Sequence, residues 1–143
     1  MKTKILSAAI LAATLVIAVI AVINGPESII THWDFSGNVT SHGSKYSILV
    51  LPAVAVLLFL VFLHYEKHPL STNKLHKIKD SEHNRQLIIS FIGIAEVAVM
   101  LIIMYVTLCA AEFLPMYTAV LIALLAAIIA MYVAMNRKLE KAA

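Results

Sequence analysis

Residues 5–23 read ILSAAILAATLVIAVIAVI and contain no charged side chain. This stretch decides the fold class, because a helix needs roughly 20 apolar residues to cross about 30 Å of hydrocarbon. It lacks the alternation of apolar and polar residues that marks a strand of a membrane barrel. Inside a bilayer the backbone must satisfy its own hydrogen bonds, which a helix does. We therefore predict that residues 5–23 form a transmembrane helix.

Three further stretches of the chain have the same character, and Glu96 is the only charged residue within them. The composition agrees, since 62% of the 143 residues are hydrophobic and 13% are charged. Soluble domains carry about 25% charged residues. We predict an all-α fold in which residues 1–143 form a single four-helix membrane bundle. The predicted helices span about residues 5–23, 46–63, 87–111 and 113–135.

Lysine and arginine are distributed unevenly between the two sides of this predicted bundle. Ten of the eleven lie in the two terminal tails and the 64–86 connection, and Lys45 alone lies on the other side. The positive-inside rule predicts that both termini and that connection are cytoplasmic, with residues 24–45 as an external loop. The apolar run after Lys2 and Lys4 exceeds the roughly 7–15 residues of a signal peptide, so we expect an uncleaved anchor. We expect no nucleic-acid partner, because the lysines do not gather with aromatic residues.

Small residues recur at helical spacing in the first and fourth predicted helices. Ala8 and Ala12, and likewise Ala119 and Ala123, are separated by four residues. Such faces mark helix contacts in lipid, within the chain or across a homo-oligomer, although alanine is also simply frequent in helices. Pro52 lies inside the second predicted helix and is expected to kink it.

The predicted external loop, residues 24–45, holds three of the four glycines and the only tryptophan. We expect Pro26 to begin a short helix that runs through Trp33 along the membrane surface, followed by a turn at residues 36–38. Loop residues on a rigid scaffold commonly carry function. The predicted binding or structural motif consists of His32, Trp33, Asp34, Gly37, Gly43 and Lys45.

Metal binding is an alternative reading of the same loop. His32, Asp34, His42 and Glu27 are of residue types that bind zinc. Their spacing matches no standard site, so we predict no metal and favour a hydrogen-bonding role for His32. Trp33 and Phe35 are expected to anchor the loop at the interface rather than to stack on a ligand.

The stretch ITHWDFSGN from Ile30 to Asn38, followed by Gly43-Ser44-Lys45, resembles the signature of a bacterial membrane domain family of unknown function. That domain also forms the N-terminal part of the Sdp toxin-immunity proteins. The family pattern is Pro-x-His-aromatic-Asn/Asp-x-x-Gly and then Gly-Ser-Lys before a transmembrane helix. The resemblance covers about residues 15–85. Ile30 replaces the usual proline, and the further helices of full immunity proteins have no counterpart here.

Glu96 is the only acidic residue inside a predicted span. Counted from Leu87 it lies about 13 Å deep, and Thr14 is equally far from the start of the first helix at Ile5. We predict a hydrogen bond between Glu96 and Thr14, or a contact of Glu96 with the backbone near Pro52. Proton coupling is one role for such a residue, and a protonated brace of the bundle is the role we favour.

These observations lead to three functional hypotheses. No nucleophile arrangement, phosphate-binding loop or metal motif is present in the sequence, so we expect a non-enzymatic protein without cofactors. The resemblance implies a multi-pass protein of the bacterial cytoplasmic membrane that serves in peptide-toxin immunity or envelope-stress sensing, with an extracellular peptide or membrane-protein partner. The alternatives are a small oligomeric proton-coupled transporter that uses Glu96, and a structural assembly subunit.

Overall fold

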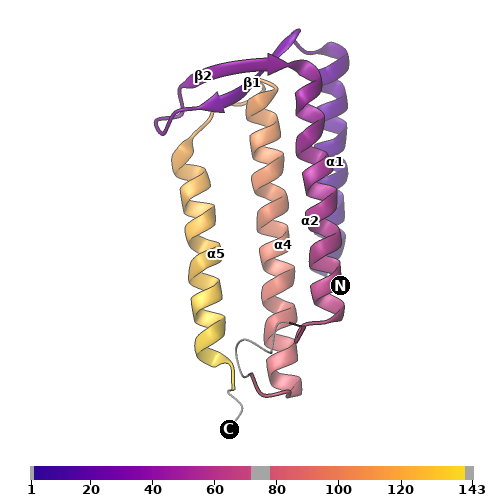
Figure 1. The fold of residues 1–143 in the computed structure, drawn as a ribbon, viewed down its shortest axis with the longest axis vertical. Coiled ribbons are helices and arrows are strands. Elements are labelled where there is room, and N and C mark those ends of the chain that lie inside the picture. The colour runs from indigo at the N-terminus through magenta and orange to yellow at the C-terminus, as the bar shows by residue number, and fades with distance from the viewer. Residues whose placement is uncertain (1, 72–77, 141–143) are drawn as a thin grey trace.

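The computed structural model describes residues 2–71 and 78–140. Within them four long helices stand side by side, and a two-stranded hairpin lies across one end of the bundle (Figure 1). The four helices confirm the predicted helical membrane architecture. The elements are α1 (Lys2–Asn24), β1 (Ser28–Trp33), β2 (Val39–Ser44), the 3₁₀ helix η1 (Lys45–Leu49), α2 (Val50–Lys67), α4 (Glu82–Ala110) and α5 (Thr118–Lys138).

All four helices are long and apolar enough to cross a membrane. The longest, α4, has 29 residues and at 1.5 Å per residue extends about 43 Å, beyond the roughly 30 Å of a hydrocarbon core. Both chain termini lie at the same end of the bundle (Figure 1). We call this end the terminal end and the opposite one the hairpin end.

Helix α4 is the centre of the bundle, because it packs against α1, α2 and α5. Two apolar clusters hold these helices together. The middle cluster contains Ile10 of α1, Ala55 of α2, and Met100 and Ile103 of α4. The upper cluster, at the hairpin end, seats Ile29 of β1 among alanines and Ile48, and its buried members are Ala18, Ala21, Ile29, Ile48, Ala110 and Ala111.

The predicted alanine contact faces do not meet other helices within the described chain. Ala8 and Ala12 of α1 and Ala119 and Ala123 of α5 are all exposed. No residue of α5 is buried, and this helix faces α4 with larger residues, as Phe91 and Tyr132 show with ring centroids 5.9 Å apart. Packing across a homo-oligomer stays a prediction.

The predicted short helix from Pro26 through Trp33 is wrong, since these residues lead into and form β1. Strands β1 and β2 pair antiparallel, with Ile29 opposite Gly43 and Trp33 opposite Val39. The β-branched run from Ile29 to Thr31 prefers an extended backbone, and pairing with β2 satisfies its polar groups. A two-stranded hairpin is marginal alone, and burial of Ile29 in the upper cluster supplies the missing support.

Pro52 lies closer to the start of its helix than predicted. The second span begins as η1, and α2 itself begins at Val50. Pro52 therefore lies in the first turn of α2, where a missing backbone N–H breaks no intrahelical bond. It is buried there.

Candidate functional site

The hairpin turn is organised by the carboxylate of Asp34. Its Oδ1 accepts hydrogen bonds from the backbone N–H groups of Ser36 (2.9 Å) and Asn38 (2.8 Å), and its Oδ2 accepts one from Asn38 Nδ2 (2.9 Å). The hydrogen bond from the Asn38 side chain, helped by the bonds from the backbone N–H groups, holds the pKa of Asp34 below its ordinary value. Asp34 is thus a structural residue of the turn, with both carboxylate oxygens occupied.

Gly37 lets the same turn dock on the connection between α4 and α5. Its φ of 88° lies in the left-handed region, which glycine adopts without steric cost. A Cβ at this position would overlap the carbonyl oxygen of Met116. Two independent constraints, backbone conformation and close approach, therefore require glycine here.

The connection that receives Gly37 is itself fixed by Tyr105. The Tyr105 hydroxyl donates to the carbonyl of Pro115 (3.1 Å) and accepts from the N–H of Tyr117 (2.8 Å). The bonds hold the connection beside α4 and give the turn a rigid surface to contact. The predicted connection between the last two helices, near residue 112, is too short, because α4 ends at Ala110 and α5 begins only at Thr118.

Lys45 and Gly43 close the base of the hairpin. Lys45 Nζ lies 3.0 Å from Glu27 Oε1, and the Lys45 backbone N–H donates to the Glu27 carbonyl. A Cβ on Gly43 would come within 2.7 Å of the Thr31 methyl group on the opposite strand. Of these two predicted motif residues, Lys45 thus joins the two ends of the hairpin, and Gly43 allows the strands to approach closely.

Trp33 separates two clefts at the hairpin end. One cleft, of about 270 Å³, lies between β1, α2 and α4 and includes Ile30, Leu51 and Val106. The other, of about 300 Å³, lies between the turn and α5 and includes Phe35 and Leu121. Trp33 lines both clefts and packs against the upper cluster. Its side chain therefore shapes the two clefts, in addition to the predicted role as an anchor in the membrane interface.

Phe35 is 84% exposed at the tip of the turn. Burying such a ring is favourable by about 2 kcal/mol, so insertion of Phe35 into a bilayer or against a partner would be stabilising. It borders the cleft that Trp33 and Leu121 also line. Phe35 therefore belongs with Trp33 to one apolar surface.

His32 occupies a less central place than predicted. Its side chain is exposed, and its Nδ1 lies 3.3 Å from the hydroxyl of its neighbour Thr31. The predicted hydrogen-bonding role is therefore local. Within the described residues no group of three or more His, Cys, Asp or Glu side chains is arranged to hold a metal ion.

The predicted hydrogen bond between Glu96 and Thr14 is wrong. Thr14 Oγ1 donates to the carbonyl of Ile10, whereas Glu96 Oε2 lies 2.7 Å from Lys4 Nζ. Helix α4 begins at Glu82, five residues before the predicted start at Leu87, and extends beyond the start of α1 at the terminal end. Glu96 therefore lies level with the start of α1, at the height of Lys4.

Lys4 also contacts a second carboxylate, Glu66 of α2, whose Oε2 lies 3.1 Å from the same Nζ. Three helices thus meet through one ammonium group, which lies 4.8 Å from the centre of the Phe59 ring as well. We call Lys4, Glu66 and Glu96 the lysine–glutamate cluster. The sequence offered no signal for it, because Lys4 and Glu66 lie outside the predicted spans, 92 and 30 positions before Glu96.

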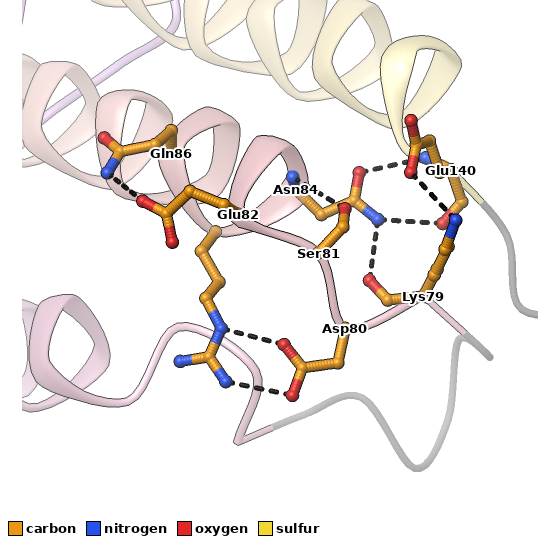
Figure 2. A network of polar contacts seen from close by, with 8 residues as sticks. Lys79, Asp80, Ser81, Glu82, Asn84, Gln86 and Glu140 are labelled. Carbon is orange, nitrogen blue, oxygen red and sulfur yellow. Dashed lines mark hydrogen bonds and ion pairs between the residues drawn. The ribbon is translucent and has the colours of Figure 1, made fainter.

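Asn84 fastens the terminal end of the bundle (Figure 2). Its Nδ2 donates to the carbonyls of Lys79 (2.8 Å) and Glu140 (2.9 Å), and its Oδ1 accepts from the N–H of Glu140 (3.0 Å). The side chain is fully buried. Asn84 therefore ties the start of α4 to the segment that follows α5.

Two further contacts lie at the start of α4. Ser81 caps the helix by accepting a hydrogen bond from the Asn84 N–H. Arg85 holds the pKa of Asp80 below its usual value through a side-chain hydrogen bond.

Comparison with known proteins gives one similarity. Residues 9–56 carry a domain of unknown function, DUF1648. No curated protein and no solved structure matches the chain. The matched range runs from α1 through the whole hairpin to the first part of α2. The predicted resemblance to a membrane domain of unknown function is confirmed over this range, which is shorter than residues 15–85 and includes the entire hairpin motif.

Proposed function

We propose that this chain is a non-enzymatic multi-pass protein of the bacterial cytoplasmic membrane that binds a peptide at its hairpin end. The role would be immunity to a peptide toxin or sensing of envelope stress, as in the Sdp proteins that the hairpin sequence resembles. The single observation that carries the proposal is the surface around Trp33, where two apolar clefts adjoin an exposed phenylalanine.

The chemistry of this surface favours a peptide with apolar side chains. The clefts measure about 270 and 300 Å³, and each can take one or two large side chains rather than a folded domain. Their walls come from β1, α2, α4 and α5, so a ligand would contact the ends of three helices at once. The outer strand β2 is exposed along almost its whole length, and such an edge can pair with an extended peptide backbone.

The placement of the charges supports access from outside the cell. The described basic residues near the two ends of the chain and in the connection that precedes α4 lie at the terminal end, so the positive-inside rule directs the hairpin end away from the cytoplasm. A secreted or membrane-inserting peptide would meet the Trp33 surface first.

A genetic challenge tests the proposal. A deletion strain carrying the wild-type chain, Phe35→Ser or Phe113→Ser is exposed in parallel to a panel of apolar antimicrobial peptides and a panel of cationic drugs. Phe113, 50% exposed, also lies at the hairpin end but lines neither cleft around Trp33, and so serves as the matched control. We expect Phe35→Ser to lose protection against at least one peptide, while Phe113→Ser keeps it.

Two outcomes of this challenge would contradict the proposal. Equal peptide resistance of the deletion strain and the complemented strain across the panel would contradict the proposal. Protection confined to the cationic drugs would also contradict it and would favour transport.

A further inference from the structure

When all three groups are ionised, the lysine–glutamate cluster has a net charge of −1. Lys4 supplies one positive charge, and Glu66 and Glu96 each supply one negative charge when ionised. The charged groups acting on Glu96 within the described residues are Lys4 from α1 and Glu66 from α2. One Lys4 ammonium pairs with both carboxylates, so the ionised cluster keeps one net negative charge next to a fully buried side chain, and binding of one cation would neutralise it.

Two buried atoms in and beside the cluster have no partner. Glu96 Oε1 and Ser7 Oγ each lack a hydrogen bond, although both side chains are fully buried. The unpartnered Oε1 of the fully buried Glu96 is therefore the second observation that points to a bound cation.

A water-accessible cleft reaches the cluster from the terminal end. It has a volume of about 700 Å³, and Lys4, Glu66, Gln86 and Ser90 form much of its polar lining. Glu66 and Lys4 are about one-fifth exposed, whereas Glu96 is fully buried. Glu96 thus communicates with water through Lys4 and Glu66.

We propose that Lys4, Glu66 and Glu96 form a proton-binding site, in which one exchangeable proton is shared between the two carboxyl groups. The proton is the cation that fits, because the Lys4 ammonium already occupies the position between the carboxylates that a metal ion would need. On the α5 side of α4, the described basic group Lys138 lines a separate cleft with Leu87 and Phe91. The site goes beyond peptide binding and lies at the opposite end of the bundle.

Infrared spectroscopy of the purified full chain in lipid nanodiscs tests this site without any peptide. The protonated-carboxyl stretching band is followed while the pH is raised from about 5 to about 9. We expect the wild type to show one protonated carboxyl per chain at neutral pH, which is lost as the pH rises. Glu66→Gln and Glu96→Gln should each lack that band at neutral pH, because either change leaves a neutral pair with Lys4.

Glu82→Gln is the matched control. Glu82 lies on the same helix and at the same end, but it is exposed and accepts a hydrogen bond from Gln86. The control should keep the wild-type band, and circular dichroism should show unchanged helix content in all variants. Absence of the band from the wild type, or its persistence in Glu66→Gln or Glu96→Gln, would overturn the shared-proton site. Loss of the band on adding sodium at constant pH would overturn the proton as its occupant.

Discussion

At the residue scale, the hairpin depends on a few side chains that each satisfy a specific physical requirement. Asp34 supplies acceptors for the three donors of the turn. Gly37 supplies a left-handed backbone and leaves room for the Met116 carbonyl. Trp33 supplies the wall between two clefts. The predicted motif is therefore held together by its turn rather than by His32, which is exposed.

Substitution of Gly37 tests the docking of the turn. Gly37→Ala places a Cβ in a left-handed conformation and against the Met116 carbonyl oxygen. We expect a loss of stability of at least about 1 kcal/mol from the backbone alone. Trp33 is the only tryptophan, so its fluorescence during thermal unfolding reports on the hairpin directly. Ser36→Ala, at an exposed neighbour whose backbone bond to Asp34 is retained, should unfold like the wild type; equal midpoints for both variants would refute the steric account.

Acid should loosen the hairpin through Asp34. Its pKa is lowered in the folded protein, chiefly by the hydrogen bond from the Asn38 side chain, so the carboxylate stabilises the fold fully above the unfolded-state pKa of about 3.9. This contribution is lost as the pH falls through the lower, folded-state pKa. We expect Trp33 fluorescence to change in that acidic range in the wild type. Asp34→Asn cannot titrate and should lack the transition; its retention would assign the transition to another group.

At the element scale, the four spans were predictable and the contacts between them were not. Charge-free runs predict each helix within a few residues, because the cost of burying charge in lipid is a local property of the sequence. The prediction makes β1 a short helix, although the β-branched run from Ile29 to Thr31 and the turn that follows, from Asp34 to Gly37, are typical of a hairpin. The sequence indicates Lys4 only as a charge that sets the topology, because its contact with Glu96 depends on the offset of α1 and α4 along their axes.

Asn84 is expected to hold the ends of α4 and α5 together. Asn84→Ala removes the side chain that binds Lys79 and Glu140 (Figure 2) and should cost about 1–3 kcal/mol. Hydrogen exchange at the Glu140 amide should accelerate by roughly 5- to 150-fold, since about 1.4 kcal/mol corresponds to a factor of ten. Gln86→Ala removes an exposed hydrogen bond to Glu82 on the same helix and should leave this amide protected. Equal exchange in both variants would show that Asn84 does not fasten the helices.

At the scale of the whole molecule, the chain has two chemically different ends. The hairpin end presents apolar clefts and one exposed phenylalanine. The terminal end carries the lysine–glutamate cluster, the Asn84 fastening and most of the positive charge. Helix α4 runs the full distance between them, and its interface with α1 is the most extensive of the bundle. The two proposals, peptide binding and proton binding, therefore concern opposite ends of the bundle.

The orientation of the hairpin end is the premise on which peptide binding depends, and thiol labelling in intact cells measures it directly. Ser41→Cys places a thiol on exposed β2, and Ser71→Cys places one at the exposed terminal end. The native Cys109 is buried, so the wild type serves as the blank. We predict that a membrane-impermeant maleimide labels Ser41→Cys in intact cells and Ser71→Cys only after permeabilisation. Labelling of Ser71→Cys in intact cells, with Ser41→Cys protected, would contradict the account.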